Sequence, residues 1–177
     1  MKKTFIIIAA ILILSCEKDE ELTSINGDGT GGFSCILNGT IMNPSGGGIG
    51  GNKTCRINYI SEEEVYFFLV GFTSDQFGFS GVDAVVFFDD FDNFEGRTFN
   101  LTGNGNNQEN YGSVIKGSYD EEGSNYSTDS IYNGTLEILH YDRENYTVSG
   151  TFEFEAVNEL GEVITISDGR FDSRLGY

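Results

Sequence analysis

Residues 146–157 have the sequence YTVSGTFEFEAV, in which apolar or small residues alternate with polar ones from Thr147 to Ala156. A period of two is typical of a β-strand that packs one face on a core and leaves the other in water. The strand is expected to pair with residues 134–141 across the turn 142–145. On its other side, residues 163–167 should pair with it across the turn 158–161. Because both turns contain residues that favour tight connections, the stretch predicts an antiparallel meander.

Short apolar runs of strand length recur along the rest of the domain, and no stretch places apolar residues at helical spacing. The predicted strands are residues 33–37, 54–60, 65–73, 82–88, 98–102, 113–119, 134–141, 146–157, 163–167 and 170–175. Ten strands predict a single all-β domain, an antiparallel sandwich or barrel. Residues 65–70 and 85–88 are apolar on both faces. These two strands are therefore expected at the centre, covered on both sides.

The N-terminus has the features of a signal peptide. Two lysines, Lys2 and Lys3, precede a short apolar run that ends at a small residue and Cys16. The run is shorter than the roughly 20 apolar residues that a membrane span needs. Residues 13–16, ILSC, resemble the lipobox of bacterial lipoproteins, which implies removal of residues 1–15 and acylation of Cys16, for example with palmitate. Several acyl chains anchor a protein firmly to its membrane. An ordinary secretory signal with an incidental cysteine is the alternative.

Residues 16–32 are acidic and then Gly-rich, and they predict a flexible tether ahead of a domain at residues 33–177. Within the tether, Lys18, Asp19, Glu20 and Glu21 resemble the surface-export signal of Bacteroidota lipoproteins. That resemblance implies an outer-membrane lipoprotein facing the cell surface; a solvated tether is the alternative. The net charge of −18 argues against nucleic acid as a partner, because phosphates are met by Lys and Arg.

Cys35 and Cys55 are the two cysteines within the predicted domain. In an exported chain such a pair predicts a disulfide. Two buried free thiols are the alternative.

No catalytic constellation can be identified in the sequence. His140 is the single histidine, so a metal site built on two histidines is excluded. The acidic turn with Asp89, Asp90 and Asp92 offers the oxygen ligands that Ca²⁺ prefers, although a solvated turn is favoured. No other cofactor is predicted. With 28 acidic residues the chain also offers carboxylate pairs of the kind that glycosidases use, which is a pattern of low specificity.

The triplet Asp129-Ser130-Ile131 resembles the short acceptor motif for O-glycosylation of exported Bacteroidota proteins. Ser130 is therefore a candidate modification site. It lies in a polar stretch expected to be an exposed loop between strands.

Four motifs together carry a family resemblance. They are FSCILNG at 33–39, NGTLEI at 133–138, VSGTFEF at 148–154 and SDGRFD at 167–172. Together they resemble a family of uncharacterised lipoproteins from Bacteroidota, which implies a β-rich exported domain and supplies no catalytic residues. The resulting expectation is a non-enzymatic, membrane-anchored binding or accessory module whose ligand the sequence does not identify. A hydrolase of envelope glycans that uses paired carboxylates is the alternative.

Overall fold

The computed structural model describes residues 21–44, 53–74, 78–106, 108–117, 122 and 124–176. The predicted signal peptide, Cys16 and the export-signal residues Lys18, Asp19 and Glu20 lie outside the described residues. Glu21 is described and exposed. The described part of the chain contains no helix with the length and hydropathy that crossing a bilayer requires.

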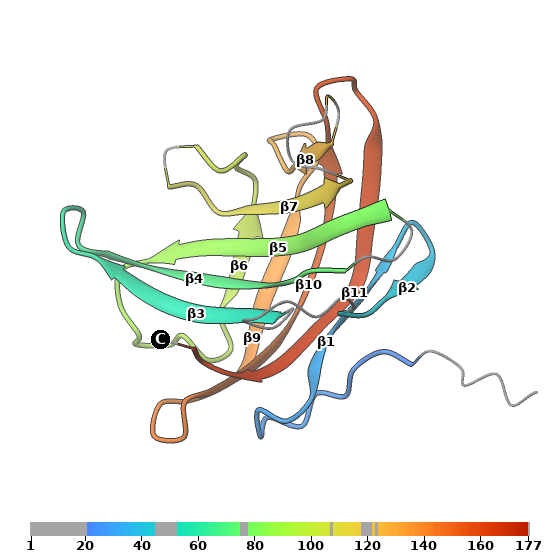
Figure 1. Cartoon of the computed structure of the whole chain (residues 1–177). Coiled ribbons are helices and arrows are strands. Elements are labelled where there is room, and N and C mark those ends of the chain that lie inside the picture. The colour runs from blue at the N-terminus through green and yellow to red at the C-terminus, as the bar shows by residue number, and fades with distance from the viewer. Residues whose placement is uncertain are drawn as a thin grey trace, which may run out of the picture.

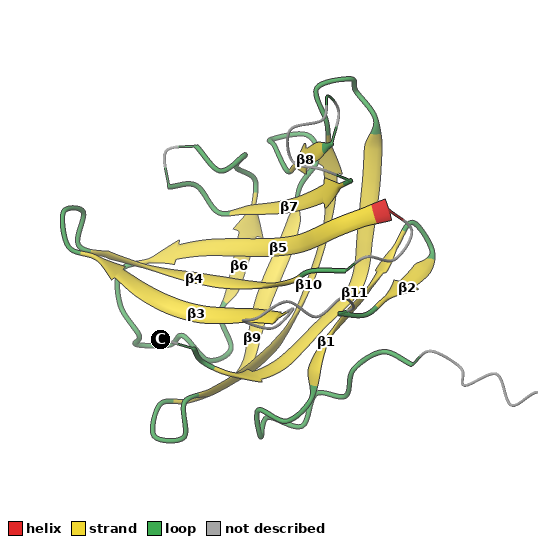
Figure 2. Ribbon diagram, in the orientation of Figure 1, coloured by secondary structure: helices red, strands yellow, loops and turns green. Residues whose placement is uncertain are grey.

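The predicted all-β fold is confirmed, and the described residues form eleven antiparallel strands joined in one sheet (Figures 1 and 2). The strands are β1 (Gly32–Leu37), β2 (Thr40–Met42), β3 (Lys53–Ile60), β4 (Val65–Phe72), β5 (Phe79–Phe88), β6 (Thr98–Leu101), β7 (Tyr111–Lys116), β8 (Asn125–Ser127), β9 (Gly134–Asp142), β10 (Thr147–Val157) and β11 (Val163–Arg174).

The sheet forks at β10. Its main path runs β2-β1-β11-β10-β8-β7-β5-β4-β3, while β9 pairs with β10 and β6 on a second branch. Residues 147–154 of β10 pair with β9, whereas Val157 pairs with β8. Figure 1 shows β3, β4, β5 and β7 crossing in front of β9, β10 and β11. The described strands thus form two crossed layers, and they do not close into a barrel.

The core lies between these layers and is dominated by phenylalanine. Phe68 of β4 contacts Phe171 of β11, with ring centroids 5.9 Å apart. Phe88 of β5 lies 6.2 Å from Phe99 of β6 by the same measure. Such contacts join the front layer to the back one, which explains why alternate residues of most strands are buried.

The predicted meander is confirmed, because β10 pairs with β9 on one side and with β11 on the other. The segments predicted as two strands, 163–167 and 170–175, form the single strand β11, which bulges near Asp168. Asp168 has a positive φ of 49°. The extra residue explains why alternation breaks there in the sequence. The three-residue strands β2 and β8 were not predicted, because they are too short to show a period.

The expectation that two strands are covered on both faces was wrong in part. β4 and β5 lie next to each other within the front layer, as predicted. On their outward face, however, Phe67, Leu69 and Phe87 are only partly buried. Val85 is buried among them. The unbroken apolar runs 65–70 and 85–88 therefore reflect an apolar outward face of β4 and β5, and this face is not covered by a second layer of the described residues.

Candidate functional site

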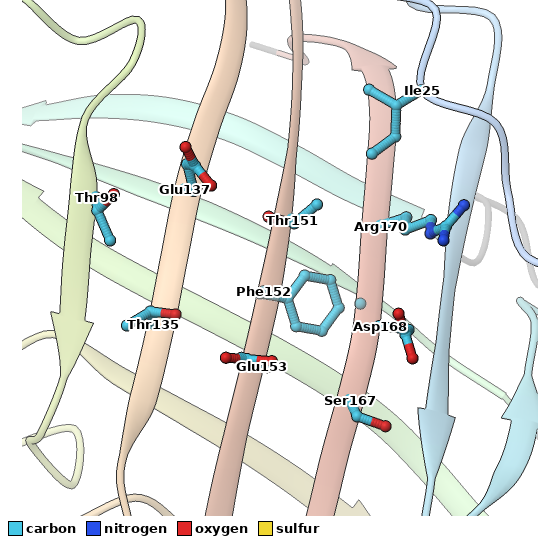
Figure 3. A pocket seen from close by; sticks show the side chains of 11 residues that line it. Ile25, Thr98, Thr135, Glu137, Thr151, Phe152, Glu153, Ser167, Asp168 and Arg170 are labelled. Atoms are coloured by element: carbon cyan, nitrogen blue, oxygen red, sulfur yellow. The ribbon is translucent and has the colours of Figure 1, made fainter.

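Two adjoining hollows of about 430 and 470 Å³ lie on the outward face of β6, β9, β10 and β11. They share the lining residues Thr135, Glu153 and Ser167, so we describe them together as the polar groove. Figure 3 shows the side chains of the first hollow, spread over these strands. The whole lining consists of Ile25, Thr98, Asn100, Thr102, Asn133, Gly134, Thr135, Glu137, Thr151, Phe152, Glu153, Phe154, Glu155, Thr165, Ile166, Ser167, Asp168, Gly169 and Arg170.

Strand pairing arranges the polar side chains in rows across the sheet. Glu137 of β9 pairs with Thr98 of β6 on one side and with Thr151 of β10 on the other. Thr151 in turn pairs with Arg170 of β11, which completes the first row. Because alternate residues of a strand share a face, these side chains all point outward. Figure 3 shows them lying in this order.

A second row follows one step along the strands. Thr135 of β9 pairs with Asn100 of β6 and with Glu153 of β10. Beyond Glu153, Ser167 and Asp168 lie at the bulge of β11. The first row thus places the Glu137 carboxylate between two threonine hydroxyls and ends at a guanidinium, and the second row combines amide, hydroxyl and carboxylate groups. Every one of these groups can make hydrogen bonds.

The groove is negatively charged. Glu137, Glu153, Glu155 and Asp168 line it, and Arg170 is the basic residue in the lining. Carboxylates accept hydrogen bonds and repel anions. The arrangement therefore suits a ligand that is rich in hydroxyl groups or positively charged.

One wall of the groove comes from the N-terminal segment predicted to be part of a flexible tether. Ile25 lines the first hollow, above Arg170 in Figure 3. The carboxylate of Asp172 accepts backbone hydrogen bonds from Asn26, Gly27 and Gly29, at 2.8, 3.0 and 2.8 Å. This part of the predicted tether is therefore attached to β11 in the structure. We call residues 23–31 the N-terminal strap.

The predicted disulfide is not formed in the structure. Cys35 and Cys55 are both free and buried. They lie on β1 and β3, which are not neighbours in the sheet. Burial raises the pKa of the Cys35 thiol to about 12 and also raises that of Cys55. Both cysteines behave as small apolar residues of the core, and spacing in the sequence could not reveal this.

The acidic turn after β5 exposes its carboxylates. Asp89, Asp90 and Asp92 are all exposed, whereas Phe94 of the same turn is fully buried. Among the described residues, no three His, Cys, Asp or Glu side chains gather in a way that could hold a metal ion. The three aspartates thus do not converge on a Ca²⁺ site. The turn is instead fixed by aromatic packing, with Phe94 stacked on Phe88 at 4.7 Å.

His140 is half exposed and forms a long contact of 3.5 Å between its Nδ1 atom and the carboxylate of Glu95. Glu95 also accepts a hydrogen bond from the Tyr141 backbone N–H. Gly27 of the strap lies against the His140 ring. The histidine therefore has a packing role beside the strap and is not among the residues that line the polar groove.

Ser130 is exposed at the tip of a tight turn. The carboxylate of Asp129 accepts hydrogen bonds from the backbone N–H groups of Ile131 and Tyr132, both at 2.7 Å. Ile131 is 76% exposed. The triplet singled out in the sequence is thus held together on the surface, where an enzyme can reach it.

Asp83 is a partly buried carboxylate that no motif marks. It lies on the outward face of β5 and lines a separate hollow of about 380 Å³ with Tyr111 and Ser113. Burial raises its pKa to about 6, while the positive charge of Arg56 acts in the opposite direction. Asp83 could not be singled out from the sequence, and the motif SDGRFD contains Asp172 without revealing its role, because both environments are made by residues far away along the chain.

One comparison with known proteins gives a match. The model of a family described as a domain of unknown function (DUF6252) matches residues 82–173, just over half of the chain. The match extends from β5 into β11 and includes Asp83 and Asp172. No curated protein and no solved structure matches.

Proposed function

The chain belongs to that family, which brings no activity with it, and we propose that the domain is a non-enzymatic binding module. Its ligand is a glycan or similar hydroxyl-rich molecule without negative charge, bound in the polar groove. The observation that carries the proposal is the pair of cross-strand rows in which Thr, Asn and Glu side chains alternate on an open surface. In ligand sites, a small number of placed polar groups fixes the orientation of the ligand.

The chemistry of the rows supports a hydroxyl-rich ligand. A sugar hydroxyl donates to Glu137 or Glu153 and accepts from Thr151 or Thr135, so one ring can satisfy neighbouring positions of a row. Hydrogen bonds to a carboxylate are stronger than those between neutral groups. The acidic side chains at the same time disfavour phosphorylated or carboxylated ligands.

We place this module on the outer membrane, held by acyl chains on Cys16 and facing the cell surface. The support comes from the lipobox-like residues 13–16 and from the acidic segment with Lys18, Asp19, Glu20 and Glu21. Six residues, 17–22, separate Cys16 from the N-terminal strap, and they can span at most about 20 Å when extended. The groove wall would then lie close to the lipid surface, which suits a ligand presented at the envelope.

A binding experiment tests the groove directly. The full chain in detergent is tested against immobilised neutral, amino-bearing and acidic oligosaccharides, and a binder is then titrated by calorimetry. We expect Glu153→Gln to weaken binding about tenfold, because a lost hydrogen bond to a charged group is worth about 1.5–3 kcal/mol. Glu63→Gln, in an exposed turn outside the groove, is the matched control and should bind normally.

Two results would overturn the proposal. One is binding confined to acidic oligosaccharides, and the other is binding that Glu153→Gln and Thr135→Val leave unchanged. Release of new reducing ends from a bound glycan would instead favour a hydrolase. That reaction needs a paired acid and base in the site.

Surface location has its own test. Proteinase added to intact cells should degrade the domain, while changing Lys18, Asp19 and Glu20 to Ala should leave the protein membrane-bound and protected. Full protection of the unchanged protein would place it on the periplasmic side.

A further inference from the structure

The N-terminal strap is bound to the sheet by a buried carboxylate. Asp172 is only 1% exposed, although it lies on the outward face of β11. One of its oxygens, Oδ2, accepts from Asn26 and Gly27, and the other, Oδ1, accepts from Gly29. A buried carboxylate is costly unless charge-assisted hydrogen bonds compensate for lost solvation. Three backbone donors on one carboxylate provide that compensation.

The glycines of the strap are required by its path. Gly27 and Gly29 have φ values of +76° and +73°, in the left-handed region that side chains disfavour. At Gly31 a Cβ would lie 2.6 Å from Cβ of Asp172 and 2.6 Å from the carbonyl oxygen of Ser24. The glycine-rich sequence therefore permits close docking of the strap against β11.

A second contact fixes the other end of the strap. The backbone N–H of Thr23 donates to Oγ of Ser34 at 2.7 Å. Ser34 lies on β1 and is fully buried. Ile25 thus lies between two attachment points, at Thr23 and at Asn26, and these hold it over the groove.

We propose that Asp172 is the positioning residue that docks the N-terminal strap, and that the docked strap forms a wall of the polar groove through Ile25. The strap is then part of the domain, and its release would open the groove at the end nearest β11. This inference depends on the proposed function only in treating the groove as a ligand site. The docking itself stands on the hydrogen bonds to Asp172.

Hydrogen exchange of the full chain in detergent tests the docking. Asp172→Asn replaces one acceptor oxygen with an NH₂ group, which is a donor. This donor would point at backbone N–H groups of the strap, which are also donors, so at least one hydrogen bond to the strap is lost. We expect exchange in the segment 21–31 to become at least tenfold faster, with exchange in β9 and β10 unchanged. Asp168→Asn is the matched control, since this aspartate is exposed on the same strand. Unchanged exchange at 21–31 in Asp172→Asn would overturn the proposal.

Gly31→Ala covers the case in which Asp172→Asn fails to fold. It keeps the carboxylate and blocks the close approach, so it should free the strap in the same selective way. If Gly31→Ala leaves the exchange of residues 21–31 unchanged, the proposed docking is wrong.

Thiol labelling tests the wall without any ligand. A cysteine introduced by Thr151→Cys lies in the hollow lined by Ile25, whereas Thr102→Cys lies in the neighbouring hollow. Adding Ile25→Gly or Asp172→Asn should accelerate maleimide labelling at position 151 several-fold and leave position 102 unchanged. If Thr151→Cys is labelled at the same rate with and without the second substitution, Ile25 does not form a wall of the groove. Because neither readout uses a glycan, failure here is distinct from failure of the proposed function.

Discussion

The ring of Phe171 on β11 occupies the space beside Gly150, its direct partner on β10, where a side chain would otherwise lie. Two residues further along, the roles of the strands are exchanged. Phe152 on β10 pairs with Gly169 on β11, and the Phe152 ring lies beside that glycine. The motifs VSGTFEF (148–154) and SDGRFD (167–172) therefore pack against each other across the β10–β11 pair. Each aromatic ring packs over a glycine in the facing strand.

Gly150→Ala should destabilise the domain by about 2 kcal/mol, as overpacking in a filled core typically does. The added Cβ would lie 2.6 Å from Cζ of Phe171 and would also collide with the carbonyl oxygen of Glu137. Urea unfolding of the two proteins measures the difference. Gly81→Ala is the control, since its Cβ would make an ordinary 3.5 Å contact with the carbonyl oxygen of Phe72. Equal loss in both variants would contradict the packing argument.

Asp83→Asn should stabilise the protein at neutral and basic pH. Burial raises the pKa of Asp83 to about 6, against about 3.9 in an unfolded chain. The folded state thus retains a proton that the unfolded chain has already released. The free energy of unfolding falls as pH rises from about 4 through 6. The asparagine removes this dependence and should gain of order 2 kcal/mol at pH 8 and nothing at pH 4.

Thermal unfolding of both proteins between pH 4 and pH 8 measures this effect. The Asp83 carboxylate also lies over Gly71 on β4, where a side chain would collide with it. Asp92→Asn, at an exposed position, should follow the unchanged protein at every pH. Parallel pH profiles for the unchanged protein and Asp83→Asn would show that the carboxylate is well solvated.

Both domain thiols should be unreactive in the native protein. Cys35 and Cys55 are buried, and burial raises the pKa of both, so little thiolate forms at pH 8. A thiol reagent should modify neither Cys35 nor Cys55 in buffer and both of them in denaturant. The intact mass should not change on reduction. A gain of about 2 Da would reveal a disulfide, since its reduction adds two hydrogens.

Cys16→Ala should release the protein from the membrane. Each CH₂ of an acyl chain that is buried in the bilayer contributes about 0.8 kcal/mol to membrane binding. Without the Cys16 thiol no acyl chain can be attached there, so this binding energy is lost. Fractionation of cells and detergent partitioning measure the change, and Cys35→Ala is the control. Retention of Cys16→Ala in the membrane fraction would place the anchor elsewhere.

Ser130 should carry a glycan in the native cell. The turn held by Asp129 presents the hydroxyl on the surface, where a glycan would disturb no packing. Mass spectra of protein purified from its native source should show a modified Ser130 peptide, and Ser130→Ala should remove the added mass. Ser61→Ala, exposed in another turn, should leave it in place. An unmodified Ser130 peptide would refute the assignment.

Local patterns in the sequence sufficed for most of the long strands, with β11 the exception because its bulge interrupts the alternation. The alternation in β10 predicted a strand, because few other structures give a period of two over so many residues. The short turns on either side of it predicted its partners β9 and β11. The attachment of the strap to β11 could not be predicted in this way. Asn26 and Asp172 are 146 positions apart, and composition cannot show which carboxylate a glycine-rich segment will meet. The groove likewise depends on strand register, which brings Glu137 beside Thr151 only after folding.

The pairing of β1 with β11 sets the order in which the domain can be completed. Residues 32–37 and residues 163–174 lie near opposite ends of the domain sequence, yet they form one ladder. Without β11, β1 would pair only with the three-residue strand β2 among the described strands. Contacts between distant parts of a chain form slowly, since the loop between them must first be closed. A chain that lacks β11 should therefore leave that edge of β1 unpaired, and an unpaired strand edge favours aggregation.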